Sequence, residues 1–215
     1  MNRITVEPYL TPYGYEEYYF TIDKKLIVEY LDDYIRLCLC DSLKTFGSAL
    51  GLCPTLGRDM VWPGDRLFVW ELIYKEEQIN LPILVCEQDL DFSCVVIVVK
   101  IRKDDHFVYW DRIGLLDHKN EDFEVEKQSG ILCVEKYSQE DWKKYGKNIA
   151  RAKVNSRKWC RWISENWSEE LLRRRRNYTF PYLQNEENII WINDTNFIFA
   201  RNEYEECVLF YKQKL

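Results

Sequence analysis

Apolar residues along this chain show the spacing of β-strands in five segments. Apolar, β-branched and aromatic residues alternate or form short runs between turn residues in segments 16–23, 66–74, 81–86, 93–101 and 106–116. Asp104-Asp105 lies between the last two segments and favours a tight turn. We therefore predict a central sheet whose neighbouring strands are mostly antiparallel.

Two other regions show helical spacing. From Leu26 to Cys38 apolar residues recur about every fourth position, although two short strands with a turn at Asp32-Asp33 also fit. The clearest helix begins at Ser138, because Ser138-x-x-Asp141 fits a capping box. Its apolar stripe continues to Trp167 with a break near Asn155, and Ser168 is expected to cap a further short helix.

After Pro181 the pattern again favours strands. The runs NIIWIN, FIFA and CVLFYKQ are separated by polar residues at 194–196 and 201–206, which predicts a C-terminal β-meander of three strands. No linker or repeat divides the chain. The expected architecture is a single α+β domain over residues 1–215, with a mostly antiparallel central sheet, the long amphipathic helix 138–167 packed on one face, and the C-terminal meander.

The composition indicates a folded protein outside the membrane. Hydrophobic residues make up 47% and aromatic residues 15% of the 215 residues. The longest uncharged apolar run, Cys94 to Val99, is far shorter than the roughly 18 residues that span a bilayer. The first ten residues lack the apolar core of a secretion signal. We therefore expect a cytoplasmic protein.

The eight cysteines are expected to be reduced, because most lie in apolar runs. No CxxC motif occurs, and only Cys38-x-Cys40 is closely spaced. We expect no cofactor and no structural metal, although the spacing leaves open whether Cys38, Cys40 and Cys53 bind one.

Charge is unevenly distributed. The chain carries −6 overall, whereas Lys143 to Arg176 holds twelve basic and three acidic residues, a local +9 that leaves −15 for the remainder. Such an acidic remainder attracts basic partners. The run Arg173 to Arg176 would suit phosphate or nucleic-acid recognition, but a solvated helix face or contacts with the acidic body explain it as well. We favour those readings and do not expect nucleic acid as the partner.

Motifs for catalysis are missing from the sequence. There is no GxGxxG and no phosphate-binding GxxxxGK loop, and both histidines, His106 and His118, are expected in solvated turns. We therefore do not expect an enzyme. A small enzyme with a carboxylate and tyrosine site near the irregular stretch 40–65 remains an alternative, as does a nucleic-acid-associated regulator.

One region resembles a known class of proteins. Leu81 to Ala150 is similar to bacterial immunity proteins of polymorphic and contact-dependent toxin systems, chiefly at Trp110 to Gly114 and at Glu140 to Trp142. The resemblance implies a non-catalytic protein that binds and neutralises a cognate toxin, expected to be a basic, nuclease-type domain. It assigns no binding residue.

The expected partner contacts come from loops that join strands and helices, because such loops project from a rigid scaffold. Two irregular acidic stretches meet this condition. The predicted partner-binding residues are Asp89, Asp91, Glu121, Asp122 and Glu124.

Overall fold

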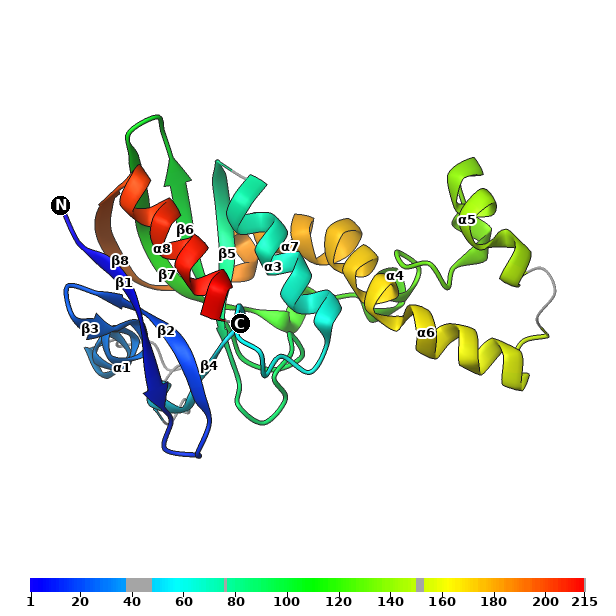
Figure 1. The fold of residues 1–215 in the computed structure, drawn as a ribbon, viewed down its shortest axis with the longest axis horizontal. Helices are drawn as coiled ribbons and strands as arrows, with labels where there is room; N and C mark the ends of the chain where they lie inside the picture. Colours follow the sequence, from blue (N-terminus) through cyan, green and yellow to red (C-terminus); the bar gives the residue numbers. More distant parts are fainter. Residues whose placement is uncertain (38–47, 76, 150–152, 215) are drawn as a thin grey trace.

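Two antiparallel sheets form the framework of the protein (Figure 1). The computed structural model describes residues 1–37, 48–75, 77–149 and 153–214. The smaller sheet has the order β1-β2-β3 and the larger β4-β5-β6-β7-β8. The strands are β1 (Ile4–Leu10), β2 (Glu16–Ile22), β3 (Lys25–Leu26), β4 (Cys53–Pro54), β5 (Gln78–Val85), β6 (Val96–Lys103), β7 (Phe107–Leu116) and β8 (Ile189–Ala200).

The larger sheet confirms the predicted α+β class with a mostly antiparallel sheet. β6 and β7 form the expected hairpin, and Asp104 stabilises its turn by accepting hydrogen bonds from the backbone N–H groups of His106 and Phe107 at 2.9 and 2.7 Å. Trp110 of β7 is fully buried and packs edge-on against Phe199. Trp110 and Phe199 thus lie in the core beside the larger sheet.

The segment predicted as a strand over 66–74 is instead helix α3 (Pro63–Lys75). Pro63 takes the first position, where a helix tolerates the missing N–H, and Asp65 lies in the first turn. Leu67 and Tyr74 are 48% and 47% exposed on the outward side of α3, so the run lacks a clearly polar side and resembles a buried strand in sequence.

The predicted C-terminal meander is also wrong, because the chain forms one long strand, β8, followed by helix α8 (Arg201–Lys214). Residues 194–196 make an irregularity within β8, where Asn196 has φ +53°, rather than a reversal of the chain. Tyr204, Cys207, Val208 and Tyr211 are the buried residues of α8, at helical spacing.

The capping box predicted at Ser138 is confirmed at the start of α5 (Gln139–Ile149). Ser138 N–H donates to Asp141 at 2.8 Å, and Asp141 N–H donates to the Ser138 hydroxyl at 3.2 Å. Asn155, at φ +64°, lies at the predicted break, and Ser156 caps α6 (Arg157–Arg174). Ser168, predicted as a cap, lies inside α6.

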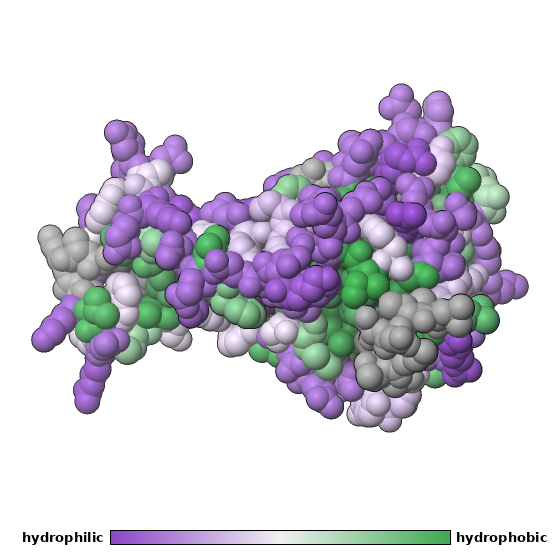
Figure 2. Space-filling view, turned by 180° about the vertical axis from the view of Figure 1, so that it is seen from behind, coloured by the Kyte–Doolittle hydropathy of each residue, from purple (hydrophilic) through white to green (hydrophobic). Residues whose placement is uncertain are grey.

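Helix α6 packs against α3, whereas α3 and α8 each contact strands of the larger sheet (Figure 1). Gly64 makes the α3–α6 contact close, since a Cβ there would lie 2.4 Å from the Ser168 carbonyl oxygen. α5 and the first half of α6 extend away from the sheets as an arm, with its own small cluster of Ile131, Tyr145 and Trp162. Figure 2 shows hydrophobic residues at the end of this arm and on the body, with polar residues between them.

The other helical segments are short or peripheral. They are α1 (Ile27–Leu37), η1 (Ala49–Gly51), η2 (His118–Asn120), α4 (Phe123–Lys127), η3 (Val134–Lys136), the π-helical turn η4 (Arg175–Thr179), α7 (Phe180–Gln184) and η5 (Glu186–Asn188). Among the helices of the described ranges, none has the length and apolar character needed to cross a membrane.

Candidate functional site

The four consecutive arginines at the end of α6 and the start of η4 are engaged inside the molecule. Arg173 pairs with Asp141, Arg174 with Glu170, Arg175 with Asp65 and Glu126, and Arg176 with Glu71. Contacts with the acidic body, one of the two readings favoured from the sequence, therefore account for Arg173, Arg175 and Arg176, whereas Arg174 pairs within α6. Carboxylates bind these guanidinium groups. Recognition of a nucleic acid would require the same groups to bind phosphates.

Arg175 and Asp65 form one of the two deeply buried pairs, the other being Arg174 and Glu170. Arg175 Nε donates to Asp65 Oδ1 at 2.8 Å, and the Asp65 side chain has no solvent exposure. Burial raises the pKa of Asp65 above its ordinary value, against the opposing attraction of the guanidinium. The pair joins α3 to η4.

The same guanidinium brings together the two acidic stretches singled out in the sequence. Arg175 Nη1 donates to Glu126 of α4 at 3.2 Å, while its guanidinium lies 5.1 Å from the centre of the Phe92 ring in the β5–β6 loop. His118 adds a second link, because its environment includes both Glu121 and the Cys94 backbone. We call the combined residues 87–93 and 117–127 the acidic surface.

Asp89 and Asp91 occupy different environments in this surface. Asp89 is exposed and lies beside two cysteine thiols. Asp91 is half-buried, and its Oδ1 accepts hydrogen bonds from Ser93 N–H and the Ser93 hydroxyl at 2.8 and 2.6 Å. Asp91 therefore shapes its own loop, whereas Asp89 projects outward.

In the second stretch the carboxylate of Glu124 is largely exposed, whereas those of Asp122 and Glu121 contact other groups of the protein. Asp122 caps α4 by accepting hydrogen bonds from the N–H groups of Glu124 and Val125 at 3.0 and 3.1 Å. Glu121 lies 3.1 Å from His118 Nδ1. Glu124 has a 76% exposed side chain and pairs only with Lys127 of its own turn.

Two apolar side chains that were not predicted as partner contacts lie among these acidic residues. Phe123 is 62% and Val125 48% exposed on α4. Both residues follow closely after the capping Asp122 and lie inside an acidic stretch. This placement is the feature of the sequence that could have indicated their exposure. The exposed aromatic ring of Phe123 thus lies among the carboxylates of the acidic surface.

The two histidines occupy different environments. His118 is half-buried rather than in a solvated turn, and although burial favours its neutral form, Glu121 raises its pKa. His106 lies in the exposed β6–β7 turn, as predicted.

The alternative prediction is an enzyme with its site near residues 40–65. Of these, residues 40–47 lie outside the described part of the chain. Residues 51–57 are buried, so they line no open site. Cys53 packs in the core, where burial raises the pKa of its thiol to about 12. Cys38 and Cys40 also lie outside the described residues.

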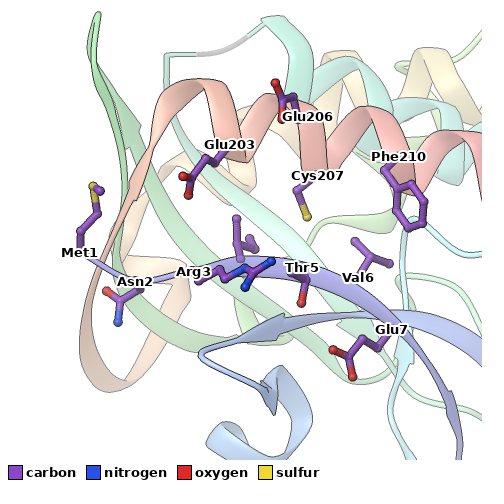
Figure 3. A pocket seen from close by; sticks show the side chains of 11 residues that line it. Met1, Asn2, Arg3, Thr5, Val6, Glu7, Glu203, Glu206, Cys207 and Phe210 are labelled. Carbon is purple, nitrogen blue, oxygen red and sulfur yellow. The ribbon is translucent and has the colours of Figure 1, made fainter.

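A groove of about 820 Å³ runs between β1 and α8 (Figure 3). Glu203, Cys207 and Phe210 face β1 across it, and Glu7 and Arg3 lie on the β1 side. Burial raises the pKa of Cys207 to about 12, so its thiol is protonated at neutral pH and is a poor nucleophile. The groove offers carboxylates and a sheet edge, but no histidine.

A cluster that sequence spacing did not reveal lies at the base of the β5–β6 loop. The side-chain ligand atoms of Cys86, Asp89 and Cys94 all lie within 4.8 Å of one another. The hairpin brings Cys86 and Cys94 together, and their spacing of seven intervening residues matches no short metal motif. The six described cysteines are unpaired in the structure, and their reduced state in solution stays a prediction.

The residues of the immunity-protein resemblance have structural roles. Trp110 fills the core, and Asp141 closes the α5 cap and binds Arg173. Gly114 allows β8 to approach, since a Cβ there would lie 2.7 Å from Ile189 Cγ2. Comparison with known proteins adds no relative: no family model, no curated protein and no solved structure matches the chain.

Proposed function

We propose that this protein binds a cognate basic protein toxin and neutralises it without catalysis of its own. The observation that carries the proposal is the convergence of the two acidic stretches into the acidic surface, with Phe123 and Val125 exposed within it. The resemblance at Trp110 to Gly114 points to the same role.

Charge supports a basic partner. The arginine run is held by internal carboxylates, so it does not offset the exposed acids Asp89 and Glu124. A nuclease-type toxin holds its phosphate substrate in a basic groove, and an acidic surface of this kind is its electrostatic complement. Covering that groove would exclude the substrate.

Asp89, Asp91, Glu121, Asp122 and Glu124 remain the proposed acidic contacts, and we add Phe123 as the apolar anchor. Phe123 and Glu124 are the most useful for testing, because their side chains are largely exposed and hold no other element in place. Asp91 and Asp122 also shape the backbone, so their loss would change the surface as well as its charge.

The first experiment is co-expression with the product of the gene immediately upstream. A toxic product, rescue of growth and a stable complex are expected. If no neighbouring product is toxic and the purified chain instead converts a small molecule, the neutralising role is wrong.

The second experiment locates the surface. The double variant Phe123→Ala/Glu124→Lys is expected to weaken the complex by about 10- to 100-fold, since a central anchor contributes about 2 kcal/mol or more. The matched control is Leu209→Ala/Glu206→Lys on α8, where Leu209 is 52% exposed. Loss of binding in the control alone would place the interface at the groove and refute the acidic surface.

A further inference from the structure

We propose that Cys86, Asp89 and Cys94 form a binding site for a divalent zinc ion at the base of the β5–β6 loop. The inference rests on their geometry and chemistry and is independent of the proposed toxin. Asp89 offers one carboxylate oxygen to the ion, so its second oxygen remains available to a partner, and the other four proposed acidic contacts are not ligands of the site.

The donor set suits zinc. Zinc takes thiolate sulfur at about 2.3 Å and carboxylate oxygen at about 2.0–2.2 Å in tetrahedral geometry, which places neighbouring ligand atoms about 3.5–4 Å apart. The three ligand atoms already lie within 4.8 Å of one another, about 1 Å wider than this spacing at most. Two thiolates exclude magnesium and calcium, which prefer all-oxygen sites.

The backbone holds the ligands near these positions without a metal. Cys86 N–H donates to the Val95 carbonyl at 3.1 Å, which aligns the two ends of the loop beside each other. Leu90 N–H donates to the Cys86 carbonyl at 2.9 Å, which turns the chain back directly after Asp89. A preorganised loop of this kind reduces the entropy lost on binding.

Three protein ligands leave one of four coordination positions open to water or to a group from a partner. Cys94 and Asp89 are exposed, so the ion has a route of entry. Zinc would clamp the loop that carries Asp91 and Phe92, and Phe92 packs on both Phe68 and Arg175. The ion would therefore stiffen one half of the acidic surface.

The test uses the full chain, reduced and freed of metal by a chelator. Titration with Zn²⁺ is expected to give one bound ion per chain, and Co²⁺ is expected to produce thiolate-to-cobalt charge-transfer absorption. Cys86→Ser and Cys94→Ser should each lower zinc affinity by about a hundredfold, because each removes one of a few strong bonds. Asp89→Asn should lower it by at least about tenfold.

Cys160→Ser is the matched control, because Cys160 is an exposed free thiol on the distant α6 and should leave zinc affinity unchanged. Circular dichroism of each variant confirms that it is folded. Absence of zinc binding by the reduced, folded chain would overturn the proposal, as would full binding by Cys86→Ser or Cys94→Ser. Neither result depends on growth rescue, so it leaves the proposed function standing.

Discussion

At the scale of single residues, the buried pair of Asp65 and Arg175 determines how α3 meets η4. Substitution Asp65→Ala leaves a buried guanidinium with only Glu126 and Thr179 as side-chain hydrogen-bond partners. We expect a loss of about 3 kcal/mol in the free energy of unfolding, measured by urea titration, because removing one partner of a buried pair strands the other charge. The control Glu165→Ala breaks the exposed pair with Arg161 and should cost about 0.5 kcal/mol or less. Equal losses in both variants would contradict this account.

Asp141 gives the stability of the protein a dependence on pH. Arg173 binds its two oxygens at 2.6 and 3.0 Å and holds the pKa of Asp141 well below its ordinary value. A depressed folded pKa stabilises the fold above the unfolded pKa of about 3.9, and this contribution is lost as pH falls further. Asp141→Asn should therefore unfold more easily than the parent by about 1–2 kcal/mol at pH 7, with the difference shrinking below about pH 4. Urea titrations at several pH values test this, and a difference that does not vary with pH would refute it.

At the scale of elements, the close crossing of α3 and α6 fixes where the arm leaves the body. Substitution Gly64→Ala would place a methyl group 2.4 Å from the Ser168 carbonyl oxygen, which lies on helix backbone that has little freedom to move. We expect destabilisation of about 1–3 kcal/mol by overpacking, measured by thermal or urea unfolding. Ser164→Ala, on an exposed position of α6, should change stability by less than about 0.5 kcal/mol. A neutral Gly64→Ala would show that the two helices are not held this closely.

At the scale of the whole molecule, the charge distribution predicts how the proposed partner is captured. If the acidic surface meets a basic toxin, the association rate constant should fall by about tenfold or more between low salt and about 0.5 M salt, with a smaller change in dissociation. Surface plasmon resonance at several salt concentrations measures both rates. Glu124→Gln should weaken the salt dependence, whereas Glu203→Gln in the groove should not. A salt-independent association rate would argue against electrostatic capture.

The sequence by itself determined those features that depend on neighbouring residues. The β6–β7 hairpin follows from Asp104, the start of α5 from the reciprocal bonds of Ser138 and Asp141, and the break before α6 from Asn155. These signals act within a few residues, so the tertiary structure did not change them. Each of these features also requires a particular side chain, so it can be recognised in a single sequence.

Only the tertiary structure decided the elements and contacts whose cause is distant in the chain. α3 packs against both the sheet and α6, and its outward side carries the exposed Leu67 and Tyr74, so it lacks the polar face that would mark it as a helix. Asp65 lies 110 residues from Arg175, and Glu126 lies 49 residues from it. The convergence of the acidic stretches and the Cys86–Asp89–Cys94 cluster depend on how strands and helices pack. The spacing of residues along the chain therefore does not predict them.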